Sequence, residues 1–158
     1  MKKTIAASAI AIAVLASMGA SCESTASVSV DNFRANLTGL EAVPPTSTGT
    51  AGTATAVLAP QLNEISVTIN HAIDPADVTR VTLNAGSAGQ TGGVYFNVSP
   101  PVARGQWSLT LTEAEFTPQG SITTFTQFWS VLRAGQVYVN METRQHSTGE
   151  VRGQLVKL

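Results

Sequence analysis

Apolar and polar residues alternate along most of the chain from Phe33 onward, and clusters of Gly, Pro, Asn or Asp separate the alternating segments. A period of two residues is typical of β-strands that bury one face. The sequence predicts about eight strands, with the ranges 33–38, 53–58, 62–70, 78–84, 94–98, 107–111, 137–143 and 151–156. Many short strands in one chain favour an all-β fold, an antiparallel Greek-key-like β-sandwich or barrel.

One segment departs from the alternation and predicts a short helix over residues 124–133. Its apolar residues recur at steps of three or four, which places them on one side of a helix: Ile122, Phe125, Phe128, Trp129 and Leu132. Thr124 and Gln127 have the spacing of a capping box, and Gly135 is a favourable residue just beyond a helix end. We expect the aromatic stripe to pack on the sheet, and the alternative is that it lines a ligand pocket.

The N-terminus has the three parts of a secretory signal. Lys2 and Lys3 supply positive charge, residues 5–18 form an apolar stretch, and Gly19-Ala20-Ser21 offers small residues to a peptidase. The apolar stretch is shorter than the ~20 residues of a membrane-spanning helix. The sequence therefore predicts a signal peptide over residues 1–21, a tether over 22–31 and a β domain over 32–158. The predicted location is the periplasm or cell envelope, or the medium after secretion.

Cys22 is the only cysteine, so no internal disulfide can form. It directly follows Gly19-Ala20-Ser21, which resembles the box that precedes the lipidated cysteine of bacterial lipoproteins, although Gly19 stands where Leu is usual. One interpretation is lipidation of Cys22, which would anchor the protein to a membrane without spanning it. The other is ordinary cleavage after Ala20 or Ala26, which removes Cys22 or leaves it as a free thiol.

The charge of the chain argues against nucleic acid as a partner. Charged residues make up 12% of the chain, about half the ~25% usual for soluble domains. Without Lys2 and Lys3, seven basic residues face ten acidic ones, a net charge of −3. The sequence contains no run of Lys or Arg, and phosphate backbones are bound by clustered positive charge. Nucleic acid is therefore not an expected partner.

Three predicted strands carry polar residues at alternate positions, and so on one face each. These residues are Arg80, Thr82 and Asn84, then Asn140 and Glu142, then Glu150 and Arg152. Tyr138 shares the face of Asn140 and Glu142, and Gln154 shares the face of Glu150 and Arg152. If the strands are neighbours, the residues other than Tyr138 and Gln154 form the predicted polar surface patch, with Glu142 and Glu150 near Arg80 and Arg152. One interpretation is a solvated face with cross-strand ion pairs, each worth about 0.2–1 kcal/mol. The other is a binding patch for a protein, a glycan or a small ligand.

Residues with obvious chemistry are few. His71 and His146 have no cysteine or carboxylate at the spacing of metal ligands. The glycine-rich segment 86–93 lacks the lysine and following helix of a phosphate-binding loop, and no segment resembles a nucleophile elbow. We therefore expect no catalytic residue, no metal site and no cofactor.

Four segments together resemble the CHRD (chordin) domain family. They are residues 33–45, Gly92-Gly93-Val94, residues 135–143 and, most specifically, Gly149-Glu150-Val151-Arg152-Gly153-Gln154-Leu155. The resemblance implies an all-β domain of the kind found in extracellular chordins, which antagonise growth factors, and in exported bacterial proteins. It does not imply an enzyme.

The chain departs from this family at three positions. Many members carry His-x-His before the glycine-rich loop and another His after Tyr-Val-Asn-x, where this sequence has Thr82, Asn84 and Glu142. Because this chain lacks the three histidines, any metal-binding or proton-transfer role that they have in other members is in doubt here. The expected function is a non-enzymatic extracytoplasmic CHRD-domain protein, a binding or structural module of the cell envelope. The alternative is a metal-binding Greek-key protein related in architecture to Cu/Zn superoxide dismutase, against which the missing histidines argue.

Overall fold

The computed structural model describes residues 29–98 and 104–158. The predicted signal peptide, Cys22 and most of the predicted tether lie outside these residues. The first strand begins at Asp31, one residue before the expected start of the β domain.

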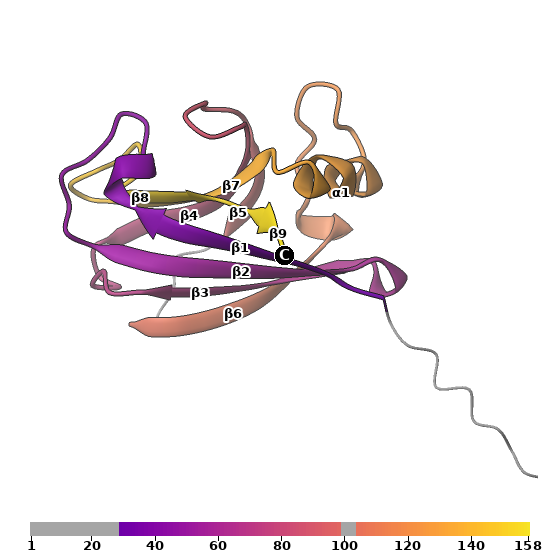
Figure 1. Cartoon of the computed structure of the whole chain (residues 1–158), viewed down its shortest axis with the longest axis horizontal. Coiled ribbons are helices and arrows are strands. Elements are labelled where there is room, and N and C mark those ends of the chain that lie inside the picture. The colour runs from indigo at the N-terminus through magenta and orange to yellow at the C-terminus, as the bar shows by residue number, and fades with distance from the viewer. Residues whose placement is uncertain (1–28, 99–103) are drawn as a thin grey trace, which may run out of the picture.

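The described residues form nine antiparallel strands that curl into a nearly closed barrel, with one short helix at one end (Figure 1). The fold class predicted from the sequence is confirmed, as a barrel. The strand order is β5-β4-β7-β8-β1-β2-β3-β6, and β9 pairs with β1. The elements are β1 (Asp31–Thr38), η1 (Gly39–Glu41), β2 (Ala51–Ala59), η2 (Pro60–Leu62), β3 (Glu64–His71), β4 (Val78–Ala85), β5 (Val94–Val98), β6 (Gly105–Thr112), η3 (Glu113–Glu115), α1 (Phe125–Arg133), β7 (Val137–Thr143), β8 (Val151–Gln154) and β9 (Val156–Lys157).

The last predicted strand is in fact two strands. β8 ends at Gln154, and β9 begins at Val156, which pairs with Arg34 on β1. Leu155 between them is buried, and its backbone N–H donates to the carbonyl of Val137 at 2.9 Å. β8 lies between β7 and β1, whereas β9 pairs with β1. An alternation of apolar and polar residues does not reveal where a strand loses one of its two partner strands, so the sequence predicted one continuous strand.

The barrel interior is filled by alternate residues of each strand, as the period of two predicts. On β1 these residues are Phe33, Ala35 and Leu37, and the β1–β2 and β2–β3 pairs keep register over their full length. The sheet order begins at β5 and ends at β6, so these two strands are its edges. Trp107 on β6 is only partly buried for this reason.

The helix α1 begins and ends where the sequence predicts. Thr124 is the N-cap: its hydroxyl accepts the N–H of Gln127 at 3.2 Å, and the Gln127 side chain accepts the Thr124 N–H at 3.1 Å. Phe125, Phe128 and Leu132 are buried in the core. The Phe128 ring centroid lies 5.1 Å from that of Tyr95 on β5. The apolar stripe therefore packs on the sheet, as expected.

The two sides of the barrel differ. The glycine-rich loop between β4 and β5, the connection from β1 to β2, and α1 with the segment before it rise on one side, while β2, β3 and β6 form the other (Figure 1). Among the described residues, no helix has the length and apolarity to cross a membrane.

Candidate functional site

Strands β4, β7 and β8 are neighbours, so their predicted polar faces do adjoin. Thr82 lies opposite Asn140, and Asn140 lies opposite Arg152. The next row joins Asn84, Tyr138 and Gln154. The strand period predicted the faces of Tyr138 and Gln154, although neither residue was included in the predicted patch. We call the outer side of these strands the covered polar face, formed by Thr82, Asn84, Tyr138, Asn140, Arg152 and Gln154.

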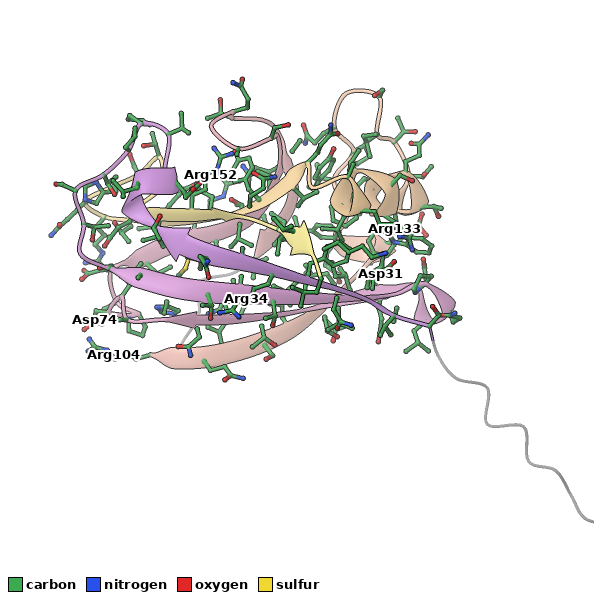
Figure 2. The ribbon with its side chains drawn as sticks, viewed as in Figure 1. Asp31, Arg34, Asp74, Arg104, Arg133 and Arg152 are labelled. Atoms are coloured by element: carbon green, nitrogen blue, oxygen red, sulfur yellow. The ribbon has the colours of Figure 1, made fainter. Side chains whose placement is uncertain are left out.

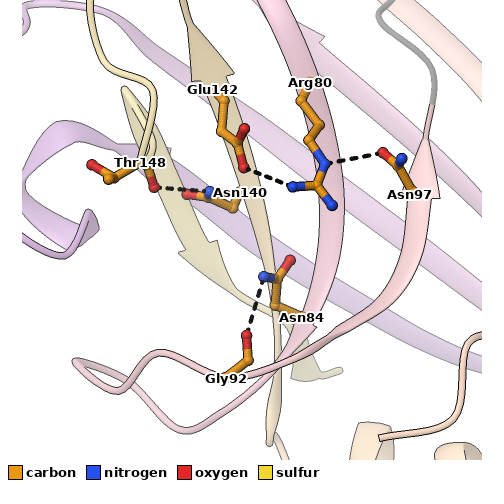
Figure 3. Close-up of polar contacts among 7 residues, drawn as sticks. All are labelled: Arg80, Asn84, Gly92, Asn97, Asn140, Glu142 and Thr148. Carbon is orange, nitrogen blue, oxygen red and sulfur yellow. Dashed lines mark hydrogen bonds and ion pairs between the residues drawn. The ribbon is translucent and has the colours of Figure 1, made fainter.

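Arg80 and Glu142 pair at the margin of this face. Arg80 Nη1 lies 3.7 Å from Glu142 Oε1, and Arg80 Nε donates to Asn97 Oδ1 at 3.2 Å (Figure 3). The two residues are opposite each other in the β4–β7 register. The Arg80 side chain is 40% exposed, so this pair is partly screened by solvent and contributes little to stability.

Four of the predicted surface residues are not at the surface. Thr82, Asn84, Asn140 and Arg152 are each at most 8% exposed. Loops fold over them: Asn84 Nδ2 donates to the carbonyl of Gly92 at 3.5 Å, and Asn140 Nδ2 donates to that of Thr148 at 3.1 Å (Figure 3). The strand period gives the face of a residue, but it does not tell whether a distant loop covers that face.

Glu150 binds the segment between η1 and β2. Its Oε1 accepts the Thr48 hydroxyl at 3.0 Å, and its carbonyl accepts the Thr46 hydroxyl at 2.8 Å. Glu150 therefore holds a loop in place, and the expected proximity of Glu150 to the two arginines does not appear as an ion pair.

Arg152 is a buried cation, only 2% exposed (Figure 2). Its Cζ lies 3.5 Å from the centroid of the Tyr138 ring, and its Nη2 donates to the carbonyl of Ser87 at 2.9 Å. Burial lowers the pKa of Arg152, and electrostatic interactions with Tyr138 and Glu41 partly oppose this effect. Within the described residues, no carboxylate forms an ion pair with it.

The glycine-rich loop, residues 86–93, is hydrogen-bonded to this face at both ends. Gln154 Nε2 donates to the carbonyl of Gly86 at 2.9 Å, and the Tyr138 hydroxyl accepts the N–H of Gly92 at 3.3 Å. Gly86 has a φ of 140°, a backbone conformation that other residues rarely adopt. A Cβ atom at Gly92 would overlap the carbonyl oxygen of Ala85. The loop conformation therefore depends on glycine at both ends.

Several buried polar atoms beneath this loop have no hydrogen-bond partner among the described residues. They are Thr82 Oγ1, Asn84 Oδ1, Arg152 Nη1 and Gln154 Oε1. Buried polar atoms in proteins are nearly always hydrogen-bonded, to protein, water or ligand. Of the eight such atoms among the described residues, these four lie on one face, and the others belong to His71, Trp107 and Trp129.

A cleft of about 530 Å³ lies beside the loop. Residues of the loop line one side, including Ser87, and Gln119, Ser121 and Ile122 line another, together with Val131 of α1. Tyr95 is the only titratable residue in its lining, and burial raises the pKa of the Tyr95 hydroxyl. The cleft thus offers hydroxyl, amide and apolar groups, without a charge.

The two histidines lie on different elements of the fold. His71 ends β3 on the inner side of the barrel, is 3% exposed, and has no hydrogen-bond partner for either ring nitrogen among the described residues. His146 lies in the turn after β7, where its backbone carbonyl accepts the N–H groups of Thr143 and Gly149. In the parts of the chain that the structure describes, no three His, Cys, Asp or Glu side chains group as metal ligands would.

A comparison with protein-family models decides the family. The model of the CHRD domain matches residues 33–155, from β1 through the residue after β8. The chain belongs to the CHRD domain family. No curated protein and no solved structure matches it significantly. The CHRD match includes every residue of the covered polar face, the glycine-rich loop and α1, so the candidate site lies wholly within the family's domain.

Proposed function

We propose that this CHRD protein is an exported, non-catalytic binding module of the cell envelope, and that the loop-bearing side of the barrel is its binding side. The observation that carries this proposal is the covered polar face, with its unpartnered buried atoms and the adjoining cleft. Binding residues often lie on loops that a rigid scaffold positions. In this chain the antiparallel barrel is the scaffold.

The export part of the proposal rests on the N-terminal sequence. Charge, a short apolar stretch and small residues precede Cys22 in the order of a secretory signal. Labelling cells with a palmitate analogue separates the two fates of Cys22. A label that disappears in Cys22→Ser supports a lipid anchor, whereas an unlabelled protein in the extracytoplasmic fraction supports ordinary cleavage.

The non-catalytic part rests on the state of the charged side chains near the face. Glu142 is paired with Arg80, and Glu150 accepts a hydrogen bond from Thr48. General acid–base catalysis needs a titratable group within hydrogen-bond reach of the substrate. The cleft lining supplies only Tyr95, whose raised pKa keeps it protonated at neutral pH. These groups suit recognition better than proton transfer.

Metal analysis of protein purified without chelators tests the alternative of a metal-binding Greek-key protein. The proposal predicts no stoichiometric copper or zinc, because Thr82, Asn84 and Glu142 stand where many relatives carry histidines. One equivalent of either metal per chain would overturn the proposed function in favour of the alternative.

Photo-crosslinking in intact cells tests the binding side directly. A diazirine amino acid replaces Ser121, which lines the cleft, or Thr55, an exposed residue of β2 on the opposite side. We expect a defined mass addition from position 121 and none from position 55, measured by intact mass spectrometry of the purified protein. Equal products from both positions, or none from either, would contradict the assignment of the binding side.

A further inference from the structure

The charge of Arg152 is not neutralised by the protein around it. Its guanidinium stacks on Tyr138 and donates through Nη2 to the Ser87 carbonyl, but Nη1 is buried without a partner among the described residues. A buried charge costs several kcal/mol unless it is paired and hydrogen-bonded. A neutral ring and one carbonyl are weak compensation for a full charge at 2% exposure.

The carboxylates near Arg152 are engaged elsewhere or remain distant. Glu142 is 3.7 Å from Arg80, and Glu150 accepts from Thr48. The charge of Glu41 acts on Arg152 and raises its pKa, yet the two residues form no ion pair. The net charge beneath the glycine-rich loop is therefore positive.

The other unpartnered atoms have a pattern that fits a bound oxyanion with water. The Thr82 hydroxyl and Arg152 Nη1 are both buried donors that could bind an anion. The two residues occupy the same row of the sheet, with Asn140 between them. Asn84 Oδ1 and Gln154 Oε1 need donors instead, and water molecules around the anion would supply them.

A second cavity adjoins this region at Gln154. It has a volume of about 360 Å³, and Ala88 of the glycine-rich loop and Gln154 of the covered polar face both line it. Arg34 and Glu41 also line it (Figure 2 shows Arg34 and Arg152). Arg34 forms no ion pair among the described residues, so it adds positive charge on the way to Arg152.

We propose that Arg152 and Thr82 bind the carboxylate group of a small ligand beneath the glycine-rich loop, with access through the cavity that Arg34 lines. The proposal rests on the proposed function and names its ligand class. A carboxylate carries one negative charge, which balances one guanidinium and can accept two hydrogen bonds. A phosphate dianion fits less well, because Glu41 adds negative charge at the entrance.

Thermal unfolding of the purified full-length protein in sodium formate tests the site. Formate is the smallest carboxylate, and neutral formamide is its matched control at constant ionic strength. A ligand that binds only the folded state raises Tm with the logarithm of its concentration above Kd. We expect such a rise with formate, a smaller one with inorganic phosphate, and none with formamide.

Two variants separate binding from folding. Thr82→Val keeps the shape of the side chain and removes the hydroxyl, so we expect an unchanged or higher Tm without ligand and formate affinity at least about tenfold weaker. Arg152→Lys should abolish the formate response. Arg104→Gln, which removes an exposed arginine paired with Asp74, is the charge control and should respond as the wild type does.

The outcomes are distinct. A formate response lost in Thr82→Val and kept in Arg104→Gln supports the site. An equal or larger response to phosphate would overturn the carboxylate assignment. No response of the wild type to formate would mean that water alone satisfies these atoms, and would overturn the inference. The proposed function would then still stand if position 121 crosslinks and position 55 does not, so the two failures are distinguishable.

Discussion

At the residue scale, a single glycine sets the distance between two strands. Gly153 on β8 is one such position, because a Cβ atom there would overlap the carbonyl oxygen of Asn36 on β1. The contact is with backbone, which cannot rotate away as a long side chain can. Glycine is therefore required where β8 packs against β1, within the segment that most specifically resembles the CHRD family.

We predict that Gly153→Ala destabilises the protein by about 1–3 kcal/mol, the usual range for a core that is overpacked by added atoms. Gly49→Ala is the matched control, because a Cβ atom there meets nothing within 4 Å. Urea unfolding measures both free energies. Equal values for the two variants would show that the β1–β8 spacing relaxes at little cost.

The burial of His71 predicts that the folded protein is less stable in mild acid. Burial is the main cause that lowers the pKa of His71 below its ordinary value of 6.5; the nearby backbone of Ile73 opposes this effect, and the positive charge of Arg104 acts in the same direction as burial. The unfolded chain therefore binds a proton at His71 before the folded protein does. Stability is full above about pH 6.5 and falls as the pH drops below it.

The comparison of urea unfolding at pH 7.5 and pH 5.5 checks this sign. The wild type should be less stable at pH 5.5, and His71→Met, which is apolar and of similar size, should lose much of that difference whatever its absolute stability. A His71→Met variant with the full pH dependence of the wild type would assign the effect to other groups.

At the element scale, α1 was predictable because its signals are local. The capping box, the apolar stripe and Gly135 all lie within 14 residues of one another, from Ile122 to Gly135. The strands were predictable for the same reason, since each carries its own alternation. The break between β8 and β9 was not, because β8 has neighbouring strands on both sides whereas β9 pairs with β1, and this difference leaves no periodic signal.

The N-cap of α1 should contribute measurably to stability. Thr124→Ala removes the acceptor of the Gln127 N–H and should cost about 1 kcal/mol. Thr126→Ala, an exposed change in the first turn of the same helix, should cost less or even stabilise slightly. Chemical unfolding of both variants decides, and a larger cost for Thr126→Ala would contradict the capping role.

At the scale of the whole molecule, side-chain contacts join segments that lie far apart in the sequence. At the start of β1, Asp31 accepts a hydrogen bond at 2.7 Å from the Nε of Arg133, which is the last residue of α1 (Figure 2). Asp31 also forms an ion pair with Lys157 of β9. Such pairs, like the cover that the loops form over Arg152, join residues far apart in sequence. The sequence could place residues on faces, but it could not show which loops return to cover them.

The ion pairs of Asp31 predict a second loss of stability, at a lower pH than that of His71. Hydrogen bonds from Lys157 and Arg133 hold the pKa of Asp31 below its ordinary value of 3.8. Its stabilisation is therefore present above pH 3.8 and is lost as the pH falls through the lower folded-state pKa. Asp31→Asn should cost about 1 kcal/mol at pH 7, and the difference from wild type should shrink in strong acid. Asp77→Asn, at an exposed turn, is the control. A difference that persists undiminished in strong acid would contradict the ion-pair account.

The central claim is that the covered polar face beneath the glycine-rich loop of this barrel binds a carboxylate. The most direct test is a titration of uniformly ¹⁵N-labelled full-length protein with sodium formate, followed by backbone amide chemical shifts. The account predicts saturable shifts that cluster in residues 82–93 and 150–154, with small changes on β3 and β6. Shifts that are absent from those two segments, or scattered evenly over the barrel, would contradict it.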